Sequence, residues 1–288
     1  MIDFEPKYDF LVGIDSDGCA FDTMELKHKE CFIPNIINYM ELQGASKYAR
    51  EAAEFVNLYS KSRGINRFPA LVEVLEWLQK RPEVKARGLK IDIPQALRDW
   101  IGRETKLGNP ALEKAVEETG NGELRHVLAW SKAVNEAIAG MVRGVPPFPY
   151  VRECLEKLAT KADVMVVSAT PQEALEREWA EHDLAGYVRI ICGQEAGTKR
   201  EHLVMARKYA AGRTLMVGDA PGDHKAAVAN DALFFPVNPG DEEASWRRLY
   251  EEGIDRFLSG TFAGEYQQEL LDEFDRYLPK KPPWPVEG

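Results

Sequence analysis

The chain contains few cysteines, and none of them stands in a zinc-binding or disulfide-forming pattern. No two of them form a C-x-x-C pair, and no histidine stands at zinc-ligand spacing from them. Disulfides are typical of oxidising compartments. We therefore expect reduced thiols and a cytoplasmic location. The four residues are Cys19, Cys31, Cys154 and Cys192.

Three further features are absent from the sequence, and their absence argues against membranes, nucleic acids and dinucleotide cofactors as binding partners. Residues 1–6 lack the basic and apolar segments of a signal peptide, and no apolar run reaches the length of a membrane-spanning helix. The net charge is −10, whereas proteins that bind nucleic acids or anionic membranes carry an excess of basic residues. No G-x-G-x-x-G follows the first predicted strand, which disfavours a dinucleotide-dependent oxidoreductase. We expect a small-molecule partner, no nucleic acid and no membrane; the oligomeric state is not encoded in any pattern we recognise.

What the chain does contain is an alternation of apolar strands and amphipathic helices. Its 288 residues suffice for two domains, and 44% of them are hydrophobic, enough for a sizeable core. Strands separated by helices of this length indicate βαβ units and a parallel sheet. The predicted strands are residues 10–14, 164–167, 188–192, 215–217 and 232–235, and the predicted helices between them are 151–159, 172–182, 200–210 and 224–230.

Residues 23–143 have a different character, because their apolar residues recur only at helical spacing. We therefore predict an α/β core domain formed by residues 1–22 and 144–288, with an all-helical insertion over residues 23–143. The segment after Pro239 is predicted to be helical and to pack on the core. The proline-rich end, residues 279–285, is expected to be loose.

Polar residues follow the predicted strands where each one ends. Asp15 and Asp17 follow the first strand, Ser168 (or, as an alternative, Thr170) follows the second, and Lys199 follows the third. Asp219 and Asp223 follow the fourth strand. The carboxyl ends of parallel strands meet at one edge of a sheet, and neighbouring carboxylates there favour a hard cation such as Mg²⁺. By itself, Asp-x-Asp-Gly is equally typical of an ordinary acidic turn.

Taken in order, these motifs resemble the haloacid dehalogenase (HAD) superfamily of phosphohydrolases. The matching residues are Asp15-x-Asp17-Gly18, Ser168, Lys199, and Gly218-Asp219 with Asp223. The resemblance implies a Rossmann-like parallel sheet, and the helical insertion corresponds to that superfamily's type-1 cap. It also implies a Mg²⁺ cofactor held by Asp15, Asp219, Asp223 and the backbone carbonyl of Asp17.

The resemblance also implies a role for each residue. Asp15 would attack phosphorus and form an aspartyl phosphate, and Asp17 would act as acid and then as base. Ser168 would donate a hydrogen bond to the phosphate, and Lys199 would offset the crowded negative charge. Gly18 would let the backbone approach the ligand. Arg63, Asn66 and Arg67 lie in a predicted loop, residues 62–69, that suits an anionic substrate.

The acid at Asp17 favours a phosphate ester over a carbon–halogen bond as the substrate. We therefore predict a Mg²⁺-dependent phosphatase for a small phosphorylated metabolite of the phosphoglycolate or sugar-phosphate kind. A phosphomutase stays open, although Lys27, with His28 beside it, stands where such mutases carry histidine. A catalytically silent binding protein is the third alternative, and the intact acids with Lys199 argue against it. Cys19 and Ala169 depart from the residues that the superfamily usually carries.

Overall fold

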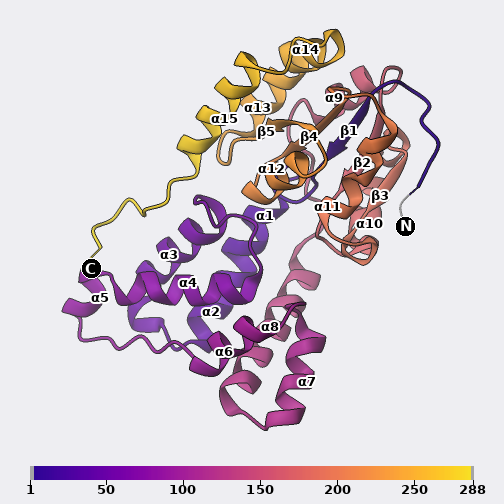
Figure 1. The fold of residues 1–288 in the computed structure, drawn as a ribbon. Helices are drawn as coiled ribbons and strands as arrows, with labels where there is room; N and C mark the ends of the chain where they lie inside the picture. The colour runs from indigo at the N-terminus through magenta and orange to yellow at the C-terminus, as the bar shows by residue number, and fades with distance from the viewer. Residues whose placement is uncertain (1–2, 287–288) are drawn as a thin grey trace. The chain divides into compact units, whose positions relative to one another are not determined.

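The computed structural model describes residues 3–286 and contains a five-stranded, all-parallel sheet. The strand order is β3-β2-β1-β4-β5, so the first strand lies at the centre (Figure 1). This confirms the predicted α/β class, and every predicted strand is found within two residues of its expected ends. The strands are β1 Leu11–Ile14, β2 Asp163–Val167, β3 Ile190–Cys192, β4 Thr214–Gly218 and β5 Leu233–Pro236.

The register brings the ends of the three central strands level with one another. Ile14 at the end of β1 pairs with Val166 of β2 and with Val217 of β4. The amide of Asp15 continues this pairing by donating to the carbonyl of Val217 at 3.0 Å. The residues that follow β1, β2 and β4 therefore emerge at the same edge of the sheet.

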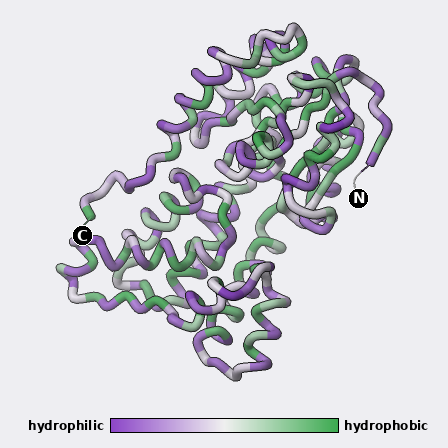
Figure 2. Tube along the Cα trace, viewed as in Figure 1, coloured by the Kyte–Doolittle hydropathy of each residue, from purple (hydrophilic) through white to green (hydrophobic). Residues whose placement is uncertain are grey.

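Alternation along the strands divides the sheet residues between two apolar clusters. Val12 and Ile14 belong to one cluster, whereas Leu11 belongs to the other. The first cluster also contains Val151, Leu155 and Trp179 from two helices, and the second contains residues of three other helices. The sheet is therefore covered on both faces, which is why its strands are apolar throughout. Figure 2 shows green and purple alternating along the outer helices, as expected for helices with one buried face.

The helices between the strands differ from the prediction at two points. They are α9 Val151–Leu158, α10 Gln172–Glu181, α11 Lys199–His202 and α12 Pro221–Val228. The predicted helix over residues 200–210 is the short α11 followed by a 3₁₀ segment, Leu203–Lys208. Helix α12 begins three residues earlier than expected because Pro221 occupies its first turn and the Asp223 carboxylate accepts from the amide of Ala220.

The segment after Pro239 is helical and packs on the sheet, as predicted. It comprises α13 Glu242–Arg248, a π-helical turn Leu249–Gly253, α14 Ile254–Ser259 and α15 Glu265–Tyr277. Trp246 and Phe257 are fully buried in the first apolar cluster, and Phe274 of α15 is buried in the second.

The inserted segment contains only helices among residues 23–143, all of which the structure describes. Its large apolar core includes Trp130, which packs edge-on against Phe32 and Phe68. Within residues 3–286, no helix combines the length and apolarity needed to cross a membrane. The helices are α1 Thr23–Leu26, a π-helical turn Lys27–Phe32, α2 Ile33–Tyr39, a 3₁₀ turn Gln43–Ala45, α3 Ser46–Leu58, α4 Arg67–Gln79, α5 Pro82–Ala86, α6 Gln95–Arg103, α7 Asn109–Thr119 and α8 Gly122–Met141.

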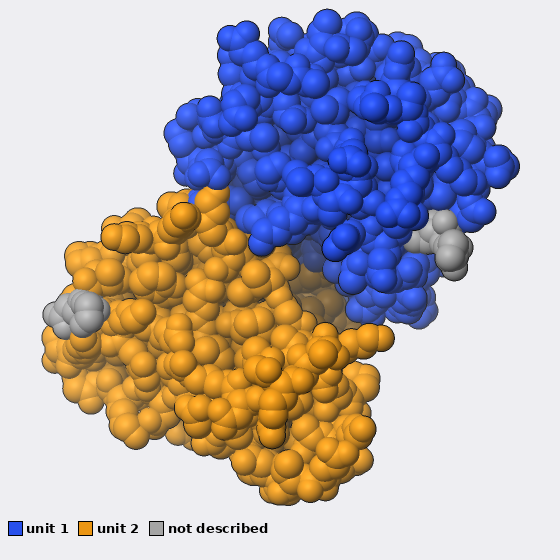
Figure 3. Space-filling view, viewed as in Figure 1, with its two compact units in different colours: residues 1–24, 143–278 blue, residues 25–142, 279–288 orange. Residues whose placement is uncertain are grey.

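The chain divides into two compact units close to the predicted domain boundaries (Figure 3). The sheet unit comprises residues 1–24 and 143–278, and the helical unit comprises residues 25–142 and 279–288. The described residues 279–286 therefore group with the helical unit, whereas the sequence pattern predicts them in the core domain.

Residues 279–285 are predicted to be loose, and this prediction is wrong, because Trp284 contacts the helical unit. The Trp284 ring lies 5.6 Å from the ring of Phe55, edge to face, and the Arg81 guanidinium lies 4.5 Å from the Trp284 ring. Arg81 also stacks on Tyr48 and pairs with Glu51. Proline richness alone suggested a solvated tail, but one tryptophan provides enough apolar and cation–π contact to fix the segment.

Candidate active site

Three carboxylates converge at the edge of the sheet where β1 and β4 end. They belong to Asp15 after β1, Asp219 after β4 and Asp223 in the first turn of α12. One oxygen of each lies within 4.8 Å of the others, and the residues are at most 3% exposed. Three buried negative charges at this separation repel one another and lose solvation, so they need a compensating cation.

Lys199 supplies part of that compensation. Its Nζ donates to Asp15 Oδ2 and to Asp223 Oδ1, each at 2.6 Å. Lys199 is the first residue of α11, and a capping box between Thr198 and Glu201 fixes the start of that helix. The predicted meeting of Asp15, Lys199, Asp219 and Asp223 at one sheet edge is therefore found in the structure.

The electrostatics of the cluster favour a bound cation. Burial raises the pKa of Asp15 well above its usual value, and Asp223 and Asp219 raise it further against the opposing effect of Lys199. Burial by itself would lower the pKa of Lys199, but the carboxylates of Asp15, Asp223 and Asp219 outweigh it and the pKa is raised. The ammonium is therefore held in its charged form, and the raised pKa of Asp15 reflects the cost of a buried carboxylate, which a bound cation would offset.

The donor set fits Mg²⁺. The site offers carboxylate oxygens, which hard divalent cations prefer, and Asp219 lies beside the pair that Lys199 already contacts. With all three acids ionised, the carboxylates and the one ammonium would leave an excess of two negative charges, which one divalent cation would neutralise. The side chain of Asp17 is not part of this cluster, which is compatible with the predicted use of its backbone carbonyl instead.

Two glycines are required by the local geometry. Gly18 has φ of +79°, a conformation that residues with a side chain rarely adopt, and its amide donates to the carbonyl of Phe21 in the turn after the two acids. At Gly218, a Cβ would lie 2.5 Å from the Cβ and 2.7 Å from Oδ2 of Asp223. Only glycine at the end of β4 therefore lets the carboxylate of Asp223 reach the cluster.

Asp17 is held by a residue that sequence reasoning missed. Thr23, at the start of α1, donates its hydroxyl to Asp17 Oδ1 at 2.6 Å and is fully buried. A carboxylate with one oxygen fixed in this way keeps its other oxygen oriented. No sequence pattern that we used singles out Thr23.

Ser168 follows β2 directly and is buried. Its Oγ accepts from the amide of Thr170 at 3.2 Å, which leaves the hydroxyl hydrogen available for another acceptor. Its amide donates to the carbonyl of Cys192 on β3. The geometry is compatible with the predicted hydrogen bond to a phosphate, which stays a prediction.

The three residues predicted to bind substrate from residues 62–69 are engaged within the helical unit. The buried Arg63 donates from Nη1 to the carbonyl of Leu58 at 2.8 Å. The predicted loop is shorter than expected, because Asn66 is the N-cap of α4 and Arg67 is its first residue. Burial lowers the pKa of Arg67 to about 10, so its guanidinium stays charged while it donates to the carbonyl and hydroxyl of Ser131 and to Asn135. Their substrate-binding role stays a prediction.

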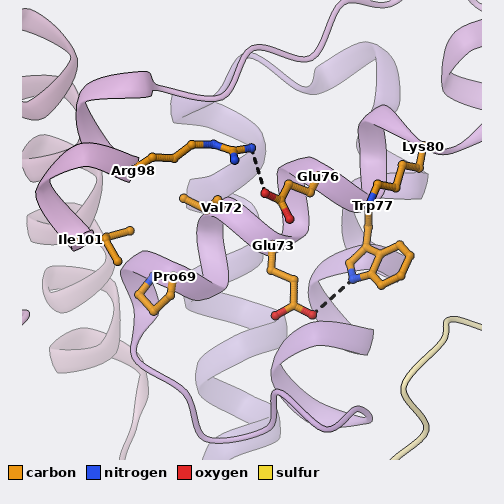
Figure 4. Close-up of a pocket in the computed structure, with 8 residues that line it drawn as sticks. All are labelled: Pro69, Val72, Glu73, Glu76, Trp77, Lys80, Arg98 and Ile101. Atoms are coloured by element: carbon orange, nitrogen blue, oxygen red, sulfur yellow. Dashed lines mark hydrogen bonds and ion pairs between the residues drawn. The ribbon is translucent and has the colours of Figure 1, made fainter. Parts of the chain in front are cut away.

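A separate shallow hollow lies on α4 and α6 of the helical unit (Figure 4). Arg98 pairs with Glu76 at 2.9 Å across it, and the Trp77 indole donates to Glu73 at 3.3 Å. The Lys80 ammonium lies 5.2 Å from the centre of the Trp77 ring. The hollow includes none of the predicted catalytic residues.

The chain resembles several solved structures in fold but matches no known family or curated protein in sequence. No protein-family model matches the chain, and no curated protein sequence does either. Among solved structures, a protein from Lactobacillus delbrueckii subsp. bulgaricus, provisionally named a phosphoglycolate phosphatase, is 15% identical with a TM-score of 0.49; the match covers 90% of this chain and 100% of that one.

Two other structures have similar scores. A protein from Bacteroides vulgatus, provisionally named a β-phosphoglucomutase, is 14% identical with a TM-score of 0.46, over 91% of this chain and 93% of its own. A HAD-superfamily hydrolase of subfamily IA from Geobacter sulfurreducens is 15% identical with a TM-score of 0.40, over 79% and 86%.

Proposed function

We propose that the protein is a Mg²⁺-dependent phosphatase that hydrolyses a small phosphate monoester through an aspartyl phosphate on Asp15. The observation that carries the proposal is the position of Lys199, which contacts Asp15 and Asp223 at 2.6 Å each inside a buried cluster of three acids. Attack on a phosphate monoester brings an anion towards a dianion, so the site must concentrate positive charge. Bound Mg²⁺ would supply the remaining positive charge and polarise the phosphoryl oxygens.

In the first step, a carboxylate oxygen of Asp15 forms a bond to phosphorus while the ester P–O bond breaks. The electron pair of that bond stays on the leaving oxygen, which takes a proton from the Asp17 carboxyl and departs as an alcohol. The hydrogen bond from Thr23 to Asp17 Oδ1 orients the proton donor. Lys199 screens the charge on Asp15 during the approach.

In the second step, the Asp17 carboxylate takes a proton from water as the water oxygen bonds to phosphorus. The bond between phosphorus and the Asp15 oxygen breaks, which releases inorganic phosphate and restores the Asp15 carboxylate. Asp17 ends protonated, ready for the next cycle. Ser168 is proposed to donate to a phosphoryl oxygen in both steps.

The substrate class that we propose is a small phosphorylated metabolite of the phosphoglycolate or sugar-phosphate kind. Gly18, Arg63, Asn66 and Arg67 remain the candidate residues for binding the substrate, and a cytoplasmic location remains our expectation. These finer assignments depend on the resemblance of the motifs.

The test is a screen of phosphate monoesters for release of inorganic phosphate, with and without Mg²⁺. We expect Mg²⁺-dependent release by the wild-type protein and at least a thousandfold loss in Asp15→Asn, which retains the shape of the side chain but not its nucleophilic charge. Release that persists without metal, or that survives Asp15→Asn, would show the proposed mechanism to be wrong.

A further inference from the structure

Ser16, between the two acids of the first motif, is tied by its side chain to helix α10. It is fully buried, and its hydroxyl donates to Glu178 Oε2 at 3.0 Å while accepting from the Trp179 indole Nε1, also at 3.0 Å. A hydroxyl has one hydrogen to donate, so donation to Glu178 and acceptance from Trp179 together fix its orientation. An ionised carboxylate is a strong acceptor for such a bond.

The backbone of Ser16 organises the turn that carries both acids. Its amide donates to Asp15 Oδ1 at 2.8 Å, and its carbonyl accepts from the amides of Cys19, Ala20 and Phe21. Asp15 is therefore held at one oxygen by Ser16 and at the other by Lys199. A shift of Ser16 would move the nucleophile and, through the next peptide bond, Asp17.

The start of helix α10 is anchored to the sheet edge by contacts that do not involve Ser16. Gln172, in its first turn, accepts from the amide of Gly193 at 2.7 Å and donates to the carbonyl of Ile191 at 2.8 Å. At the other end of the helix, the fully buried Trp179 packs edge-on against Phe21 at 5.7 Å. Phe21 belongs to the same turn as Ser16, so the anchors independent of that turn are those of Gln172. Through a helix anchored at its start, the bond from Ser16 to Glu178 constrains the catalytic turn.

We propose that Glu178 is a positioning residue for the reaction, which acts by holding Ser16 and so aligning the carboxylates of Asp15 and Asp17. This inference rests on the proposed phosphatase function, because it assigns those two acids their roles. Displacement of a reacting group by about 1 Å can lower a rate by roughly a hundredfold. Loss of the bond should therefore lower kcat more than it changes KM.

The kinetic test compares four variants with p-nitrophenyl phosphate and Mg²⁺. We expect Glu178→Ala and Ser16→Ala to lower kcat by about tenfold to a hundredfold, with KM changed by less than about threefold. Glu178→Gln keeps an oxygen acceptor and should restore most of kcat. Glu173→Ala removes an exposed carboxylate from the same helix and should behave as wild type. If Glu178→Ala and Glu173→Ala have equal kcat, the proposal is wrong. It is also wrong if the kcat of Glu178→Gln is as low as that of Glu178→Ala.

A second readout does not require turnover. The chain has six tryptophans, so the indole N–H resonances can be resolved by NMR and that of Trp179 identified by its loss in Trp179→Phe. We expect Ser16→Ala to shift this resonance, and Mg²⁺ to shift it in the wild-type protein but not in Ser16→Ala. A Trp179 resonance insensitive to both changes contradicts the inference. If the wild-type protein shows these shifts but releases no phosphate from any ester, the proposed function fails while the positioning contact stands.

Discussion

Replacement of Lys199 by methionine removes the ammonium that contacts Asp15 and Asp223, while keeping a side chain of similar length. In the native protein the ammonium contacts Asp15 and Asp223 at 2.6 Å each. The two partner side chains are 5% and 0% exposed, whereas that of Lys199 is 20% exposed. The variant therefore leaves buried carboxylates without their counterion.

The expected loss of stability in Lys199→Met follows from the exposed fractions of these side chains. Removal of one partner from a buried ion pair costs about 3–5 kcal/mol, and the partial exposure of Lys199 reduces this to roughly 2–4 kcal/mol. For a domain of this size, 1 kcal/mol changes Tm by about 2–4 °C. We expect Tm to fall by roughly 5–15 °C in metal-free buffer at neutral pH.

The assay is thermal unfolding followed by circular dichroism, with Lys208→Met as the matched control. Lys208 pairs with Asp3 and Glu5, whose side chains are 64% and 92% exposed, so its loss should lower Tm by little. Equal Tm values for the two variants would refute the reasoning that Lys199 compensates a buried cluster. Mg²⁺ should recover more stability in Lys199→Met than in Lys208→Met, because the ion replaces the lost positive charge.

The pH should change the stability difference between the wild-type protein and Lys199→Met in one direction. Burial raises the pKa of Asp15 in the native protein, whereas in the unfolded chain it titrates near 4. The native state therefore binds a proton more tightly, and the stability of the metal-free protein falls as the pH rises from about 4 through the raised pKa. The difference in Tm between the wild-type protein and Lys199→Met should become smaller as the pH is lowered, because a protonated carboxyl needs no counterion.

Three further predictions concern other parts of the chain. Gly218→Ala places a Cβ about one bond length too close to Asp223, so we expect a loss of roughly 1–3 kcal/mol in urea unfolding and weaker Mg²⁺ binding in calorimetry. Trp284→Ala removes the ring that contacts Phe55 and Arg81, and should expose residues 279–286 to limited proteolysis at a protein concentration where the wild type resists it. The cysteines are all buried, and burial raises the pKa of Cys192 to about 12, so a thiol reagent should label none of the four in the native protein and all four in guanidinium chloride.

The sheet and the acid cluster could be predicted from the sequence because both follow from local patterns. Short apolar runs between helices fix the strands, and acids directly after those runs must lie at the carboxyl edge of a parallel sheet. Asp15 can therefore be placed beside Asp219 and Asp223, although it is far from both along the chain.

The contacts that orient this cluster could not be predicted in the same way. Thr23, Glu178 and Trp179 reach the first motif only through tertiary packing, and no spacing in the sequence marks them. The C-terminal segment was misjudged for the same reason, because its placement depends on a single tryptophan meeting a distant arginine. The helical unit was recognised as helical, but no sequence pattern marks which of its residues would contact a substrate.

The most direct test of the central claim is the location of the covalent phosphoryl group. The wild-type protein is mixed with Mg²⁺ and a phosphate ester that it turns over, quenched in acid after a few milliseconds, and digested for mass spectrometry. We predict one added phosphoryl group on the peptide that contains Asp15, and none in Asp15→Asn. A phosphoryl group on any other residue, or turnover at the wild-type rate by Asp15→Asn, would contradict the assignment of Asp15 as the nucleophile.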